Sequence, residues 1–153
     1  FKVGDLRKDA LPENTYDIVT RHMVDEHLDN QGLLEISKNT LKALKPGGTL
    51  VVVFTHPEKI TASAGVNKEG WFETTFPWKG PDGEFEKGQN YFRTVESYIK
   101  ILKEAGFMID SVEDCKIPPE AEAFNKDQYE KYKKYGNVRL AVKAHKPIYV
   151  TKK

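Results

Sequence analysis

The chain has 153 residues, of which 39% are hydrophobic and 31% charged, with a formal net charge of +1. This length fits one ordinary domain, and the apolar and aromatic content argues against disorder. The balanced charge gives no overall attraction to nucleic acid or to an anionic membrane. The single cysteine, Cys115, excludes a disulfide framework or a zinc site built on several thiolates. The longest apolar run, 50–54, is far shorter than a membrane helix of roughly 20 residues, and no signal peptide is visible, so we expect a cytoplasmic protein.

The first half of the chain alternates strand-like and helix-like segments. Residues 1–5 read as the end of a strand, and 16–20 predict a second one because Ile and Val occupy its centre. A capped helix follows over 30–45 and stops at Pro46-Gly47-Gly48. Residues 49–55 form a continuous β-branched run, which predicts a strand covered on both faces.

The second half begins with a segment that lacks periodicity, 57–92, where glycine, proline and both tryptophans are concentrated. An irregular segment of this length is usually functional, and its aromatic residues favour an ordered lid. Residues 94–106 predict a helix with a threonine cap and a terminal glycine, followed by a strand over 107–112. A helix over 120–135 and a half-polar strand over 138–144 complete the pattern.

Strands that alternate with helices predict an α/β fold with a mostly parallel sheet. Ligands of such sheets bind at the carboxyl ends of the strands. The segments after the predicted strands, Asp5-Leu6, Arg21-His22 and His56, are therefore candidate binding residues. Asp5 could accept hydrogen bonds from an amine or a ribose, or bond its own backbone as a turn residue. His27 and His56 are candidate general bases because imidazole titrates near neutral pH, with a structural role as the alternative.

Several motifs are absent from the sequence. It contains neither common glycine-rich phosphate-binding loop, no nucleophile elbow, and no metal-ligand spacing among its four histidines. Lysines and tyrosines interleave over 129–135, as on some nucleic-acid-binding faces, but the acidic residues nearby favour a solvated helix. We therefore expect neither a metal site nor a nucleic-acid partner.

Four segments carry motifs in a fixed order: Val3-Gly4-Asp5, the strand 16–19, the block 41–48 with the sequence LKALKPGG, and the segment 91–107. The last contains R-T-x-x-x-Y and L-x-x-A-G-F. This ordered set resembles the class I S-adenosylmethionine-dependent methyltransferases, and its type 11/12-like small-molecule branch most closely. The resemblance implies a Rossmann-like methyltransferase fold whose mostly parallel sheet has an antiparallel last strand.

The resemblance also implies an incomplete domain. In that family, strands that carry the glycine-rich cofactor loop and a ribose-binding acid precede the segment at Asp5, whereas this chain starts at Phe1 without a methionine. We therefore expect 1–153 to be a single partial domain, with an irregular insertion at about 57–92. It would lack roughly 60 residues of a longer parent protein. Alone, it is expected to be inactive and to bind S-adenosylmethionine weakly or not at all.

The resemblance assigns roles on the cofactor side of the site. Asp5 would bind the adenine amino group, and the backbone of Leu6 would meet the edge of the ring. Arg21 and His22 would lie beside the methionine end of the cofactor. His22 and His56 are the candidate general bases, needed only if the methyl acceptor must lose a proton.

The insertion and its exit are assigned to the acceptor side. Four residues would form a lid over a small-molecule acceptor: Trp71, Trp78, Tyr91 and Arg93. Packing of the insertion onto the sheet is the alternative. A competing hypothesis for the whole chain is a non-catalytic fragment or degenerate module that binds partners, or forms a homodimer through the exposed edge of the strand at 16–19. Half of a nicotinamide-dependent dehydrogenase is a third hypothesis, disfavoured because no G-x-G-x-x-G loop is present.

Overall fold

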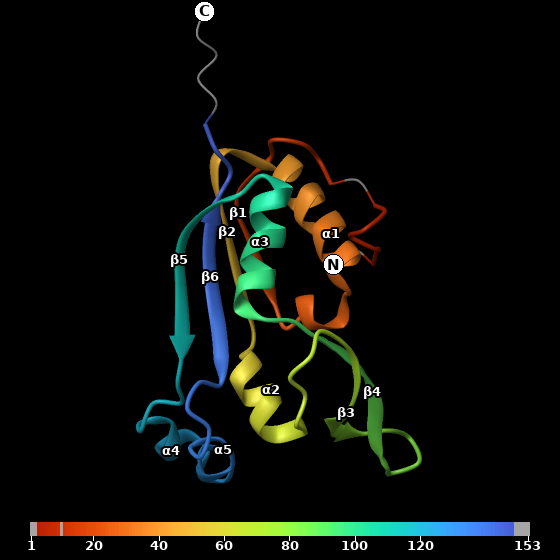
Figure 1. Ribbon diagram of the computed structural model, residues 1–153, viewed down its shortest axis with the longest axis vertical. Coiled ribbons are helices and arrows are strands. Elements are labelled where there is room, and N and C mark those ends of the chain that lie inside the picture. Colours follow the sequence, from red (N-terminus) through yellow and green to blue (C-terminus); the bar gives the residue numbers. More distant parts are fainter. Residues whose placement is uncertain (1–2, 10, 149–153) are drawn as a thin grey trace, which may run out of the picture.

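The computed structural model describes residues 3–9 and 11–148, and Figure 1 shows its elements in chain order. The main sheet contains β1 (Tyr16–His22), β2 (Leu44–Thr55), β5 (Met108–Cys115) and β6 (Arg139–His145). The helices are α1 (Asn30–Ala43), α2 (Pro57–Ala64), α3 (Val95–Ala105), α4 (Ala121–Phe124) and α5 (Lys126–Tyr132), with a short 3-10 helix at Asp25–His27. A separate antiparallel hairpin is formed by β3 (Gly70–Lys79) and β4 (Phe85–Phe92).

The strands of the main sheet follow the order β1-β2-β6-β5. β1 and β2 pair in parallel, whereas β6 runs antiparallel to both of its neighbours, β2 and β5. Three of the four strands therefore point the same way, and the last strand in the sequence lies between two of them. This arrangement confirms the predicted α/β fold with a mostly parallel sheet and an antiparallel last strand.

The core lies between the main sheet and the two long helices, α1 and α3, which pack side by side on one face of it (Figure 1). On β2, the side chains of Leu50, Val52 and Phe54 are buried beneath these helices. Val51 and Val53, which alternate with them, are only partly buried. The prediction of a strand covered on both faces is therefore wrong for the described residues, because both long helices lie on the same side.

The ends of α1 and α3 are specified locally. The carboxylate of Asp29 accepts a hydrogen bond from the Gly32 N–H at 2.7 Å, and the Thr94 hydroxyl accepts one from the Ser97 N–H at 3.1 Å. After α3, Gly106 has a φ of 106°, and an added Cβ would lie 2.8 Å from the side chain of Leu41 on α1. Glycine is therefore required there both by the backbone and by the close approach of the two helices.

The structure corrects three predicted segments. Residues 57–92 are not irregular but form α2 and the β3–β4 hairpin, where Gly88 leaves room for the ring of Phe76, which an added Cβ would overlap. The helix predicted over 120–135 is broken at Asn125, whose extended backbone ends α4 and whose side chain caps α5. Residues 3–5 form no strand, and residues 1–2 lie outside the described residues.

The carboxyl ends of β1 and β2 meet at one edge of the sheet because the two strands are parallel. In Figure 1 this is the lower edge, where α2, the hairpin and the α4–α5 pair gather. The fold therefore concentrates three peripheral elements around the strand ends, where parallel sheets bind ligands.

Candidate functional site

A first cavity, of about 340 Å³, lies between the loop at residues 4–7 and the segment that follows β1. We call it the loop cavity, and its lining residues are Gly4, Asp5, Leu6, Arg7, Val24, His27, Leu28 and Ile36. The side-chain amide of Asn39 on α1 holds the loop by donating to the carbonyls of Leu6 at 2.9 Å and Arg7 at 3.2 Å. The structure thus brings Asp5 and Leu6, both predicted cofactor residues, onto one cavity.

The carboxylate of Asp5 is held ionised by Arg7. The Arg7 guanidinium donates to its two oxygens at 2.9 and 2.7 Å, and the Arg7 backbone N–H donates at 3.0 Å. These side-chain and backbone hydrogen bonds lower the pKa of Asp5 to about 2. Oδ1 accepts two of these bonds, whereas Oδ2 accepts one and keeps a lone pair for a further donor. Apolar side chains such as Leu28 and Ile36 also lie on the walls of this cavity.

Arg21 does not face either a cofactor or solvent. Its guanidinium, in a residue only 4% exposed, donates to Asp25 at 2.8 Å, to the Ser37 hydroxyl at 3.3 Å and to the Tyr98 hydroxyl at 3.4 Å. The resemblance implied a position beside the cofactor, whereas the structure encloses this side chain among protein groups. Burial opposes the charge, but Asp25 and Tyr98 outweigh it and raise the pKa of Arg21. Burial, and then the Asp25 carboxylate, raises the pKa of Tyr98 well above its usual value.

Arg93 is not part of an acceptor lid. It is 3% exposed, and its guanidinium donates to the carbonyls of Asp25, at 2.8 Å, and of Leu28, and to the side chain of Asn30 at 3.1 Å. The ring of Tyr91 lies 4.9 Å from the guanidinium carbon. Burial lowers the pKa of Arg93. The predicted lid residue Arg93 therefore fixes the backbone of the segment between β1 and α1. We call Arg21, Asp25, Arg93 and Tyr98 the buried cluster.

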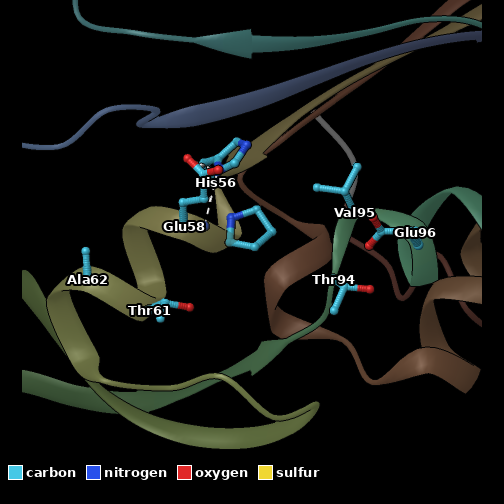
Figure 2. Close-up of a pocket in the computed structure, with 8 residues that line it drawn as sticks. His56, Glu58, Thr61, Ala62, Thr94, Val95 and Glu96 are labelled. Atoms are coloured by element: carbon cyan, nitrogen blue, oxygen red, sulfur yellow. Dashed lines mark hydrogen bonds and ion pairs between the residues drawn. The ribbon is translucent and has the colours of Figure 1, made fainter.

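His56 is the N-cap of α2 rather than a free base. Its Nδ1 accepts a hydrogen bond from the Glu58 N–H at 3.1 Å, so Nε2 carries the proton and donates to Asp114 at 3.1 Å. Figure 2 shows the imidazole above the first turn of α2, at the wall of a hollow between α2 and the start of α3. Both ring nitrogens are hydrogen-bonded within the protein, so the structure gives the predicted general base a capping role. His22, the other candidate, is exposed at the end of β1 and lines none of the cavities described here.

A second cavity, of about 560 Å³, lies between the ends of β1 and β2, the hairpin, α2 and α5, and we call it the hairpin cavity. Its aromatic lining residues are Phe76, Trp78, Phe85, Tyr132 and Tyr135. Its charged ones, besides His27, are Glu26, Lys59, Lys131 and Arg139. Thr55 and Asn90 also line it.

Of the four predicted acceptor residues, only Trp78 lines the hairpin cavity, and its indole stacks on Phe76 at 4.5 Å. Trp71 and Tyr91 form an edge-to-face pair at 5.3 Å, so these two rings pack against each other within the hairpin. Sequence reasoning missed Glu26, Lys59 and Arg139. They come from three separate elements, and no spacing in the sequence relates them.

Glu26 and Lys59 are both constrained by their surroundings. The buried carboxylate of Glu26 accepts from the Thr55 N–H at 3.1 Å and faces the Thr55 hydroxyl at 3.4 Å, which ties the 3-10 helix to the end of β2. The Lys59 ammonium lies 4.8 Å from the centre of the Tyr132 ring. Burial, and then repulsion by Arg139, lowers the pKa of Lys59.

The chain matches no family model and no curated protein. Solved structures do match it. A protein described as an S-adenosylmethionine-dependent methyltransferase from Listeria monocytogenes is 22% identical, with a TM-score of 0.68 over 94% of this chain and 67% of that one. One from Mesorhizobium loti is 18% identical, with a TM-score of 0.66 over 94% and 68%. The N-methyltransferase NodS from Bradyrhizobium japonicum, solved with S-adenosyl-L-homocysteine, is 16% identical, with a TM-score of 0.53 over 95% and 53%.

At these identities the likeness establishes the fold. The chain has the class I S-adenosylmethionine-dependent methyltransferase fold, and it spans about two thirds of the first two structures and about half of NodS. Within residues 3–9 and 11–148, no helix is long and apolar enough to cross a membrane. In the same residues, no three His, Cys, Asp or Glu side chains gather as metal ligands would.

Proposed function

We propose that this chain is the C-terminal portion of an S-adenosylmethionine-dependent methyltransferase that acts on a small-molecule acceptor. The observation that carries the proposal is the position of His27, which lines both the loop cavity and the hairpin cavity. Two adjoining cavities at the carboxyl ends of parallel strands suit a reaction between two bound molecules. The methyltransferase fold and the match over nearly the whole of this chain support it.

On the cofactor side, Asp5 would accept a hydrogen bond from the adenine amino group, and the backbone of Leu6 would lie against the ring edge. When bound, S-adenosylmethionine supplies an electrophilic methyl group. No glycine-rich loop is present in this chain, so further cofactor contacts would come from the third of the similar structures that it does not span. Binding to this chain alone would accordingly be weak.

On the acceptor side, the hairpin cavity would hold the nucleophile in line with the methyl group. Alignment of two reactants can by itself lower a barrier by about 7–11 kcal/mol. His56 is occupied as a helix cap, and His22 lies outside both cavities. We therefore propose that neither His22 nor His56 removes a proton from the acceptor during the transfer.

Calorimetric titration with S-adenosylhomocysteine tests the proposal, carried out on this chain and on the longest natural protein that contains it. We expect clear binding to the longer protein, weakened at least tenfold by Asp5→Asn because the adenine amine loses a carboxylate partner. Asp17→Asn is the matched control, since Asp17 is an exposed carboxylate paired with Lys45, away from both cavities. Failure of both proteins to bind would overturn the proposal.

A second candidate function is partner binding through β1. This strand forms an edge of the sheet, and Ile18 on it is 63% exposed. Exposed apolar edge strands pair readily with other chains. If S-adenosylhomocysteine binds to neither protein, and sedimentation of the same samples shows dimers at micromolar concentration, this second function is favoured. Monomers under those conditions would count against it.

A further inference from the structure

The charges around the hairpin cavity are unbalanced. Three cationic side chains line it, each from a different element: Lys59 from α2, Lys131 from the end of α5 and Arg139 from the start of β6. Among the residues that the structure describes, Glu26 supplies the only carboxylate on its wall. That carboxylate is already engaged by the backbone N–H of Thr55. The cavity therefore has an excess of positive charge.

The three cations have no carboxylate partner. None of them forms an ion pair with a carboxylate in the part of the chain that the structure describes. Elsewhere, exposed lysines do find partners, as Lys45 does with Asp17 at 2.8 Å and Lys133 with Glu130 at 2.6 Å. Mutual repulsion among cations that share a cavity is relieved most directly by an anion bound between them.

The walls of the cavity suit a flat apolar body. Trp78 and Phe76 stack nearly parallel, with ring planes 6° apart. Across the cavity, the ammonium groups of Lys59 and Lys131 lie 4.8 and 5.5 Å from the centre of the Tyr132 ring. Aromatic side chains on several sides favour a planar ligand.

One polar atom on the wall also lacks a partner. The amide oxygen of Asn90 on β4 is buried and accepts no hydrogen bond from the described residues. A buried acceptor without a partner costs free energy unless a ligand or water donates to it. A hydroxyl or amine on the bound molecule would satisfy it.

We infer that the hairpin cavity binds an aromatic acid: a planar ring system with a carboxylate that meets Lys59, Lys131 and Arg139 and a hydroxyl or amine that donates to Asn90. This inference rests on the proposed function and deepens it, because it names the chemical class of the methyl acceptor. The lining residues named above belong to this chain, so binding of the acid to them is measurable without the cofactor.

The test is a calorimetric comparison of two isosteric probes, 6-hydroxy-2-naphthoate and 6-hydroxy-2-naphthamide, with the full chain. We expect the acid to bind at least tenfold more tightly than the neutral amide, and its affinity to fall as salt screens the charges. Arg139→Gln and Lys59→Gln should each weaken binding of the acid about tenfold and leave binding of the amide unchanged. Lys143→Gln, an exposed lysine on the same strand as Arg139, is the matched control and should change neither.

Equal binding of the two probes, no binding of either, or equal effects of Arg139→Gln and Lys143→Gln would overturn the inference. None of these outcomes changes the result of the S-adenosylhomocysteine titration. Conversely, a clear preference for the acid in a protein that fails to bind S-adenosylhomocysteine would remove the methyltransferase proposal and retain the aromatic-acid site. The two failures are therefore distinguishable.

Discussion

The buried cluster and the hairpin cavity lie next to the same segment after β1, and they differ in how their charges are neutralised. In the buried cluster, Arg21 is paired with the Asp25 carboxylate, and Arg93 donates to two backbone carbonyls and to the side chain of Asn30. In the hairpin cavity, Lys59 and Arg139 have no carboxylate partner among the described residues. A charge enclosed by protein must be paired with an opposite charge or surrounded by hydrogen-bonding groups, since a charge without either costs several kcal/mol. A charge beside a cavity is solvated by water, so it remains available to a ligand.

The largest expected effect on the free energy of unfolding is in the buried cluster. Arg21→Ala removes the cation from a fully enclosed ion pair and leaves the Asp25 carboxylate without its partner. We expect the free energy of unfolding to fall by about 3–5 kcal/mol, as measured by urea denaturation. Lys45→Ala, which breaks the exposed pair with Asp17, should cost less than about 1 kcal/mol. Similar losses in the two variants would contradict a structural role for the buried cluster.

The next largest effect on the free energy of unfolding comes from the hydroxyl group of Tyr98. Tyr98→Phe deletes the donor that bonds the Asp25 carboxylate but keeps the ring, which packs 4.4 Å from Phe54. Hydrogen bonds to charged groups contribute about 1.5–3 kcal/mol, so we expect a loss in that range. Tyr132→Phe is the control from the cavity side, because its hydroxyl has no hydrogen bond within the described residues. If Tyr98→Phe and Tyr132→Phe had equal free energies of unfolding, the difference between the buried cluster and the hairpin cavity would be refuted.

The smallest expected effect on stability is at the hairpin cavity. The interaction between its cations is measured best as a change in the pKa of Lys59. Arg139→Gln removes one cause of the lowered pKa of Lys59, so that pKa should rise toward its ordinary value of 10.5 without reaching it, because burial remains. The free energy of unfolding should change by less than about 0.5 kcal/mol. NMR titration of the Lys59 side chain measures the shift, with Lys143→Gln as the control. No shift in Arg139→Gln would show that the two cations do not interact.

The sign of the associated pH dependence follows from linkage. Because the folded-state pKa of Lys59 lies below the unfolded value, the unfolded chain binds more protons between the two values. The contribution of Lys59 therefore opposes folding at neutral pH. That opposition is relieved as the pH rises through the folded-state pKa toward 10.5, the reverse of what a paired lysine would show.

Prediction from sequence succeeded where the signal is local. The ends of α1 and α3 depend on Asp29, Thr94 and Gly106, each of which acts on backbone within a few residues. The mostly parallel sheet with an antiparallel last strand follows from the family resemblance carried by the motifs. The hairpin was missed because its glycines suggested irregular structure, although Gly88 in fact makes room for Phe76 across the strand pair.

Side-chain roles were harder to predict because they depend on partners far away in the sequence. Asp5 and Leu6 reach a common cavity as expected, since their loop follows directly from the motif. Arg21 pairs first with Asp25, four residues away. Arg21 and His56 also bond to partners far away in the sequence, Tyr98 at 77 residues and Asp114 at 58 residues. No spacing in the sequence could reveal either partner.

The position of β6 between β2 and β5 has a consequence for the order in which the protein folds during synthesis. Among the described residues, β5 pairs in the main sheet only with β6, and β6 is the last of these strands to leave the ribosome. Until residues 139–145 emerge, β2 has an open edge and β5 has no sheet to join. Folding of this half of the sheet is thus delayed until β6 has emerged, and the non-local pairing makes that step slow relative to helix formation.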